Sequence, residues 1–228
     1  MADLFQKCHD FQDADMVKSM DLYPLFRAME GSIGSNVIYN GRRVVMNGSN
    51  NYLGLTHDPR VKQAAKDAIE RFGTGCTGSR VLNGNSILHD ELENRLADFL
   101  GKEAGLCFTT GFITNFGALS TLVDQGEYIV SDAENQPSII AGCKGTKGEV
   151  LKYRHSDMLD LERILSELSP DSGKLIVTDG VFSMTGEICK LPEIVAIKKK
   201  FSNTRLYIDD AHGMGVLGQN GRGTANHF

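Results

Sequence analysis

Two acids and a histidine follow an apolar run near the end of the chain, in the stretch IDDAHGMG at residues 208–215. An ionised carboxylate at the end of a buried strand needs a cationic or hydrogen-bonding partner, and a protonated ring nitrogen of a bound cofactor is one such partner. Asp209 and His212 lack the third ligand that a metal site requires. The remaining alternative is an ordinary ion pair between Asp209 and one of three arginines, Arg42, Arg80 or Arg222.

The stretch GTGCTGSR at residues 73–80 matches the G-x-G-x-x-G spacing of dinucleotide-binding loops. That loop follows a strand and opens a helix. Here the preceding residues 59–72 carry apolar side chains at helical spacing, after Asp58 as a cap and Pro59 at the first helical position. We therefore expect Gly73 to end a helix, and the pattern does not favour nucleotide binding.

The stretch TTGF at residues 109–112 is a second candidate. An apolar run precedes it, and a helix is expected after it. Free N–H groups at the start of that helix could bind a phosphate. An ordinary turn between a strand and a helix explains the same local pattern.

Elements that could position these residues alternate along the second half of the chain. Helices are expected from Asp157 to Pro170 and from Leu191 to Phe201. Alternating strands and helices predict a mostly parallel sheet with helices on both faces. The strands are expected in AGLCFT (104–109), EYIVSD (127–132), EVLKYRH (149–155), KLIVTDG (174–180) and RLYIDDAH (205–212).

The first 52 residues are expected to form an N-terminal arm with a helix and a β-hairpin. Asn40-Gly41 lies between two β-rich segments, which is a strong signal for a two-residue hairpin turn.

Composition excludes several classes of function. The chain has 228 residues, 41% of them hydrophobic, and a formal net charge of -5 without a basic block, so we expect no nucleic-acid partner. No apolar run approaches the ~20 residues that span a bilayer. The five cysteines are scattered singly without a C-x-x-C pair, which predicts neither a disulfide framework nor a zinc site and fits a cytoplasmic protein.

Taken together, six ordered motifs resemble the α-oxoamine synthases, which are pyridoxal-phosphate (PLP) acyltransferases such as serine palmitoyltransferase, 8-amino-7-oxononanoate synthase and 2-amino-3-ketobutyrate CoA ligase. The LYPLFR segment and the GSR-x-LNG run are most similar to the bacterial serine palmitoyltransferases. The motifs are NNYLGLTHDPRV (50–61), GTGCTGSRVLNGN (73–85), HDELENRLADFL (89–100), TTGFITN (109–115), DGVFSMTGE (179–187) and DDAHGMGVLGQNGRG (209–223).

The resemblance implies the α/β fold type I of PLP-dependent transferases, which is the aspartate-aminotransferase fold. Residues 53–228 would be part of the large PLP-binding domain, and the C-terminal small domain would be absent. The implied reaction condenses serine, glycine or alanine with an acyl-CoA or acyl-carrier thioester, releases CO2 and gives an α-amino ketone. Members of the family are homodimers, so a homodimer is expected.

The family's roles carry over to matching residues. Asp209 would pair with the pyridine nitrogen of PLP and His212 would contact the ring hydroxyl, which makes these two the expected catalytic residues. The other expected cofactor-binding residues are Thr110, Gly111, Phe112, Gln136 and Ser183. The expected substrate-binding residues are Asn51, Gly75, Ser79 and Arg80.

Two departures from the family pattern stand out. Gln136 occupies the position where the family usually has a histidine that stacks on the cofactor ring. The Schiff-base lysine of the family lies in a Ser/Thr-rich loop beyond the DDAHG motif, whereas this chain ends at Phe228, sixteen residues after His212. The chain is therefore expected to be a fragment that is inactive by itself. A non-catalytic partner subunit of the same fold remains the alternative.

Overall fold

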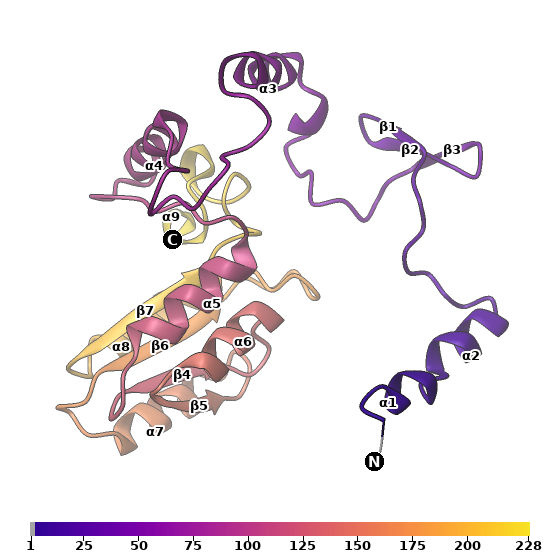
Figure 1. Ribbon diagram of the computed structural model, residues 1–228. Coiled ribbons are helices and arrows are strands. Elements are labelled where there is room, and N and C mark those ends of the chain that lie inside the picture. Colours follow the sequence, from indigo (N-terminus) through magenta and orange to yellow (C-terminus); the bar gives the residue numbers. More distant parts are fainter. Residues whose placement is uncertain (1–2) are drawn as a thin grey trace. The chain divides into compact units, whose positions relative to one another are not determined.

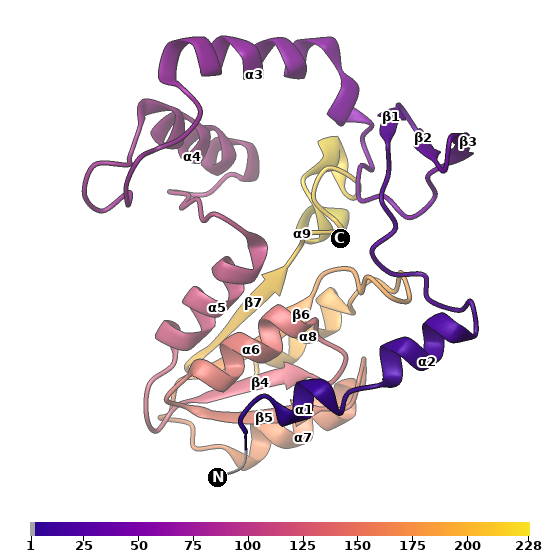
Figure 2. The same ribbon diagram turned by 45° about the vertical axis from the view of Figure 1, so that its right-hand side comes forward.

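The computed structural model describes residues 3–228, except for the side chain of Ile33. The chain divides into two compact units, one up to Gly73 and one from Thr74 to Phe228 (Figures 1 and 2). Among the described helices, none is long and apolar enough to cross a membrane. The domain boundary that the sequence suggests after residue 52 stays a prediction.

The N-terminal unit contains short helices and a small antiparallel sheet in the order β1-β2-β3. The turn Asn40-Gly41 joins β2 to β3, and both of its residues have positive φ, 49° and 68°, as a two-residue hairpin requires. The predicted hairpin is therefore confirmed. The elements are α1 (Gln6–His9), α2 (Asp13–Ser19), β1 (Gly31–Ile33), β2 (Asn36–Tyr39), β3 (Arg42–Val45), η1 (Leu55–His57) and α3 (Pro59–Phe72).

Helix α3 begins and ends where the sequence predicts. The Asp58 carboxylate accepts a hydrogen bond from the N–H of Arg60 at 2.8 Å, and Pro59 is the first helical residue. Gly73 ends the helix with φ 80°, a backbone conformation that side chains with a Cβ rarely adopt. The Gly-rich loop thus follows a helix rather than a strand, so it lacks the structural context of a dinucleotide-binding fingerprint.

The second unit is built around a parallel sheet in the order β5-β4-β6-β7 (Figure 1). All three neighbouring pairs of strands are parallel, so their carboxyl ends lie at one edge. The elements are α4 (Ile87–Leu100), α5 (Gly111–Leu122), β4 (Tyr128–Asp132), α6 (Pro137–Gly145), β5 (Glu149–Tyr153), α7 (Met158–Glu167), β6 (Lys174–Asp179), α8 (Leu191–Lys198), β7 (Thr204–Asp209), η2 (Gln219–Gly221) and α9 (Thr224–His227).

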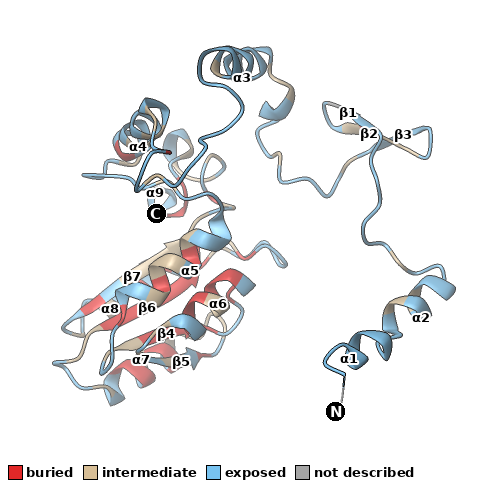
Figure 3. Ribbon diagram, viewed as in Figure 1, coloured by how far each residue is buried: buried red, intermediate tan, exposed pale blue. Residues whose placement is uncertain are grey.

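Helices cover both faces of this sheet, as predicted. On one face α7 and α8 pack against the inward side chains of β4 and β6, including Ile176. On the other face α5 and α6 bury Leu119 and Ile139 against Ile129 and Leu175. Figure 3 shows the buried residues concentrated in this sheet and the helices around it. Both faces of β6 are buried, which explains its continuous apolar sequence.

One predicted strand is wrong. Residues 104–109 form no strand in the described structure, although they are apolar. The backbone of Cys107, in the middle of this segment, bonds to side chains instead of to a neighbouring strand: its N–H donates to Glu93 Oε1 at 2.7 Å, and its carbonyl accepts from Arg80 at 2.9 Å. Apolar composition alone could not reveal these partners.

Two leucines of α7 allow a matched test of the core. Leu161 is fully buried, whereas Leu159 is 81% exposed on the same helix. We expect Leu161→Ala to lower the free energy of unfolding by about 2–5 kcal/mol, because it leaves a cavity, and Leu159→Ala to change it by less than about 0.5 kcal/mol. Urea unfolding followed by circular dichroism measures both. Equal losses in the two variants would contradict the packing described.

Candidate active site

Three carboxylates lie at the carboxyl edge of the parallel sheet. Asp132, Asp179 and Asp209 are the last residues of β4, β6 and β7, and Asp179 pairs directly with Asp209 in the strand register. Asp132 and Asp179 are buried, whereas Asp209 is half-buried. In open parallel sheets this edge is where ligands bind.

Asp209 receives its hydrogen bonds from amides. Its Oδ2 accepts from the side-chain amides of Asn115, at 2.6 Å, and Gln136, while its Oδ1 accepts from the N–H of Ala211 at 3.1 Å. Asn115 is itself held by the hydroxyl of Tyr207, which donates to its Oδ1 at 2.7 Å. Among the described residues Asp209 forms no ion pair, so the structure does not support the arginine alternative.

Asp179 is, with Asp132, one of two acids at this edge that sequence reasoning did not select. The backbone N–H of Gln136 donates to its Oδ2 at 3.0 Å, and the Gln136 side-chain amide donates to its Oδ1 at 3.1 Å. Burial and the nearby charge of Asp209 raise the pKa of Asp179 to about 6, against the opposing effect of the Gln136 hydrogen bonds and of His212. The sequence signals of Asp179 were its place at the end of an apolar run and at the start of the DGVFSMTGE motif.

The N-terminus of α5 is the second part of the site. Thr110 caps the helix, since its Oγ1 accepts from the N–H of Ile113 at 3.1 Å. In the described part of the chain, the N–H groups of Gly111 and Phe112 donate no hydrogen bond. Asn115, which bonds to Asp209, lies one turn further on, about 6 Å along the helix axis from Gly111. Free N–H groups and the helix dipole make this end suited to an anion.

The second acid of the DD pair has a structural role. Asp210 accepts hydrogen bonds from the backbone N–H of Thr224 at 2.8 Å and from its hydroxyl at 2.5 Å, which fixes the start of α9. A Cβ at Gly213 would collide with the Asp210 carboxylate. His212 is half-buried and follows the end of β7 by three residues, on the same side of the sheet edge as Asp209 along the chain.

Ser183 lies in the loop that follows β6, residues 180–189, which we call the Ser183 loop. Its two ends are anchored by the buried side chains of Phe182 and Cys189, while Ser183 itself is exposed. The loop begins beside Asp209, because the N–H of Gly180 donates to the Asp209 carbonyl at 2.7 Å. The contact of Ser183 with a cofactor stays a prediction.

The expected substrate residues are less closely tied to this edge. The Arg80 guanidinium pairs with Glu93 at 2.5 Å and lowers the pKa of Glu93 to about 2. The carbonyl of Ser79 accepts hydrogen bonds from the N–H groups of residues 82–84, which closes a tight turn over residues 79–84. Asn51 belongs to the N-terminal unit. The substrate roles of these four residues stay predictions.

Comparison with known proteins agrees with this arrangement. Residues 43–227 match the model of the family described as aminotransferase class I and II. The chain is 48% identical over 225 residues to a serine palmitoyltransferase of Bacteriovorax stolpii, covering 98% of this chain and 53% of that protein. It is 47% identical over 213 residues to an 8-amino-7-oxononanoate synthase of Thermoanaerobacter pseudethanolicus, covering 93% and 54%. The chain spans about half the length of these curated relatives.

Solved structures give the same result. A lysine-to-alanine variant of the serine palmitoyltransferase from S. paucimobilis, with a bound PLP–myriocin aldimine, matches with a TM-score of 0.95 at 37% identity, covering 99% of this chain and 57% of that one. The Sphingomonas wittichii serine palmitoyltransferase matches with a TM-score of 0.91 at 38% identity, with the same coverage. The resemblance to the α-oxoamine synthases and the fold type I prediction are confirmed, and the chain belongs to the aminotransferase class I and II family.

Proposed function

We propose that the intact protein is a PLP-dependent α-oxoamine synthase. It condenses serine, glycine or alanine with an acyl-CoA or acyl-carrier thioester, releases CO2 and gives an α-amino ketone. The observation that carries this proposal is the Asp209 carboxylate, held by two side-chain amides at the carboxyl edge of the sheet without a cationic partner among the described residues. A carboxylate placed in this way can neutralise a cationic ring.

The residues present fit PLP. The cofactor joins a basic heterocycle to a phosphate, and the site offers a carboxylate at Asp209 and an anion-binding helix end at Gly111 and Phe112. Asn115 links the two, because it lies on α5 and donates to Asp209. When bound, PLP supplies an electron sink for the negative charge that develops on the amino acid. Asp209 holds the proton on the ring nitrogen and so preserves that sink.

Asp179 and Asp209 form a pair of neighbouring acids, and burial changes the pKa of Asp179. Asp179 and Asp209 accept from the same side-chain amide of Gln136, so their negative charges lie close together. Burial raises the pKa of Asp179 to about 6, so Asp179 is the group that takes up a proton as pH falls. Protonation of Asp179 removes the repulsion between its charge and that of Asp209.

The remaining roles follow the family pattern. His212 would contact the ring hydroxyl with Ser183 nearby, and Thr110 caps the helix end that would bind the phosphate. Gln136 would lie against the ring in place of the family's histidine, and its amide is held by the two acids. Asn51 and the loop of residues 75–80 receive the amino acid and the thioester.

One observation favours a second candidate, a non-catalytic partner subunit of the same fold. An amide replaces the stacking histidine at Gln136, and a subunit that has lost catalysis would tolerate that change. For the enzyme we propose a homodimer in the cytoplasm. The five free cysteines are consistent with that compartment. Uptake of PLP by the intact protein separates the two, because the partner subunit would not bind it.

We expect the intact protein to bind PLP with a visible absorbance band that shifts when serine, glycine or alanine is added. Asp209→Asn removes the charge that keeps the ring nitrogen protonated, so CoA release should fall at least about 100-fold. Asp171→Asn makes the same change at an exposed position before β6 and should leave the rate unchanged. A wild-type protein that takes up no PLP would refute the proposal and support the partner subunit.

The raised pKa of Asp179 predicts a pH dependence of stability. The folded protein binds this proton more tightly than the unfolded chain, so the contribution of the group is favourable below pH 4 and is lost as pH rises through about 6. The free energy of unfolding of Asp179→Asn, relative to wild type, should therefore rise between pH 4 and pH 7, by at most about 3 kcal/mol. Urea titrations at several pH values measure this difference, and a flat or falling difference would contradict it.

A further inference from the structure

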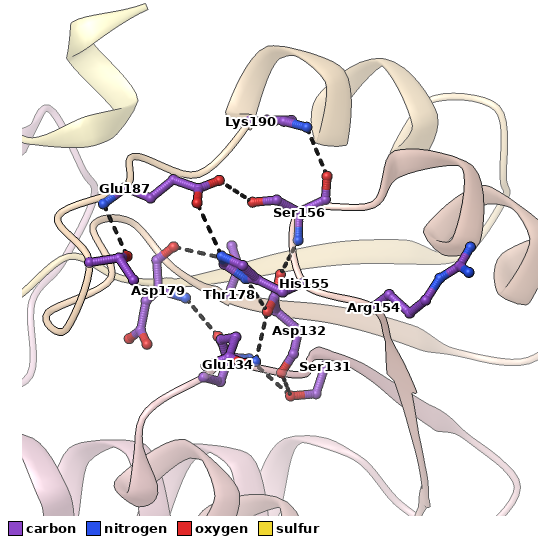
Figure 4. A network of polar contacts seen from close by, with 12 residues as sticks. Ser131, Asp132, Glu134, Arg154, His155, Ser156, Thr178, Asp179, Glu187 and Lys190 are labelled. Atoms are coloured by element: carbon purple, nitrogen blue, oxygen red, sulfur yellow. Dashed lines mark hydrogen bonds and ion pairs between the residues drawn. The ribbon is translucent and has the colours of Figure 1, made fainter.

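A histidine joins the turn after β5 to the Ser183 loop (Figure 4). The Nδ1 atom of His155 lies 2.8 Å from Asp132 Oδ1, and its Nε2 atom lies 3.3 Å from Glu187 Oε2. Asp132 ends β4, whereas Glu187 belongs to the Ser183 loop. The ring also meets the Phe182 ring edge-on, with centroids 4.5 Å apart. His155 therefore contacts both an anchor of the loop and its exposed part.

Both carboxylate contacts can be hydrogen bonds at once only if the ring is an imidazolium, because a neutral imidazole has a single N–H and ionised carboxylates only accept. Burial lowers the pKa of His155, but the hydrogen bonds and charges of Asp132 and Glu187 outweigh burial, and the net shift is upward. The Ser156 hydroxyl, 2.6 Å from Glu187 Oε1, is the main cause of the lowered pKa of Glu187. The geometry and the charges around His155 thus both favour the imidazolium form.

The two bonds differ in strength. Asp132 has a side chain only 2% exposed and also accepts from the N–H groups of Glu134, at 2.9 Å, and Ser156, at 3.1 Å. Glu187 is 42% exposed, and its contact with the ring is longer. When the ring loses a proton, the remaining N–H stays with the buried acid, because an unsatisfied buried acceptor is costly. The ring lone pair then faces the Glu187 carboxylate and repels it.

Between its buried anchors Phe182 and Cys189, the Ser183 loop is held to other elements through Glu187. Among the described residues, the side-chain hydrogen bonds from this loop to other elements all involve Glu187, which bonds to His155 and Ser156. Inside the loop, the N–H of Phe182 donates to the Glu187 carbonyl at 2.9 Å, and the N–H of Gly186 donates to the Phe182 carbonyl at 2.8 Å. Movement of Glu187 is thereby transmitted to both ends of the segment that carries Ser183.

Other charged groups surround the network without replacing this contact. Lys190 donates to the Ser156 carbonyl at 2.9 Å, and Arg154 points to the start of α7, where it pairs with Asp157 at 2.8 Å. Arg154 also lies 3.6 Å from Asp160. Electrostatic interactions also link Asp132 to Tyr153 and Cys189, and link Glu187 to Lys190. Figure 4 shows two further acids beside them, Glu134 and Asp179.

We propose that His155 is a positioning residue that, as an imidazolium, ties Glu187 to the end of β4 and so holds the Ser183 loop at the active-site edge. Deprotonation breaks the contact between His155 and Glu187, leaves the Glu187 carboxylate hydrogen-bonded, among the described residues, to Ser156 alone, and so loosens the loop. The inference rests on the proposed function only for what Ser183 contacts. The charge state of His155 and the order of the loop are properties of the protein itself, and they can be measured without turnover.

The intact protein, labelled with 15N-histidine, allows the ring of His155 to be titrated by NMR. We expect its pKa to lie above 6.5 in the wild type and to fall in Glu187→Gln, which removes one of the two charges. Glu193→Gln, a matched change at an exposed glutamate of α8, should leave it unchanged. A His155 ring that is neutral below pH 6.5, or one that does not respond to Glu187→Gln, would overturn the proposal.

Amide hydrogen exchange measures the loop in the same samples. After correction for the intrinsic pH dependence, exchange at Phe182 and Gly186 should accelerate about tenfold or more as pH rises through the pKa of His155. Glu187→Gln and His155→Gln should exchange fast at all pH values, while the core amide of Ile176 stays protected in every variant. Unchanged exchange at Phe182 in both variants would refute the positioning role.

Binding of the cofactor tests whether the contact of His155 with Glu187 matters at the active site. In the intact wild type, the dissociation constant of PLP, followed by visible absorbance, should rise severalfold across the same pH interval, and this pH dependence should vanish in His155→Gln. If the wild type binds no PLP, the proposed function fails while the titration and exchange results still decide the role of His155. If PLP binds with the same affinity at every pH, the positioning role at the site is wrong.

Discussion

The parallel pairing of β4, β6 and β7 places three carboxylates at one edge of the sheet. Hydrogen-bond donors from the surrounding elements stabilise these buried and half-buried acids. Each acid has its own set of hydrogen-bond donors. Asp132 is bonded by a histidine and by backbone N–H groups, Asp179 by the backbone and side chain of Gln136, and Asp209 by amides. None of these donors is an arginine, so the edge keeps negative charge that a ligand can use.

The helices that cover the sheet supply these donors. Asn115 on α5 and Gln136 at the start of α6 both reach Asp209, so the packing of α5 and α6 against one face of the sheet is also what sets the geometry of the site. The buried side chain of Leu119, one turn after Asn115, fixes this part of α5. Core packing and site chemistry therefore depend on the same helices, and a change in either one is felt in the other.

The comparisons and the site support two different conclusions. Family membership rests on the match across residues 43–227 and on the fold, whereas the proposed reaction rests on Asp209, the α5 N-terminus and their connection through Asn115. Gln136 is a departure from the family pattern, because the family usually has an aromatic ring at this position. In this chain the amide bonds to two acids at once, which a neutral imidazole with its single N–H does not do.

The sequence by itself determined the elements whose signals are local. Asp58, Pro59 and Gly73 marked the ends of α3, Asn40-Gly41 specified the hairpin, and the motif order identified the family. Only the tertiary structure decided that Asp210 bonds to Thr224 while Asp209 faces α5 and α6, and that the apolar residues 104–109 form no strand. The reason is physical: partners such as Asn115 and Asp209 lie 94 residues apart, and the distance between them is set by sheet register and helix packing, which no short window of sequence contains.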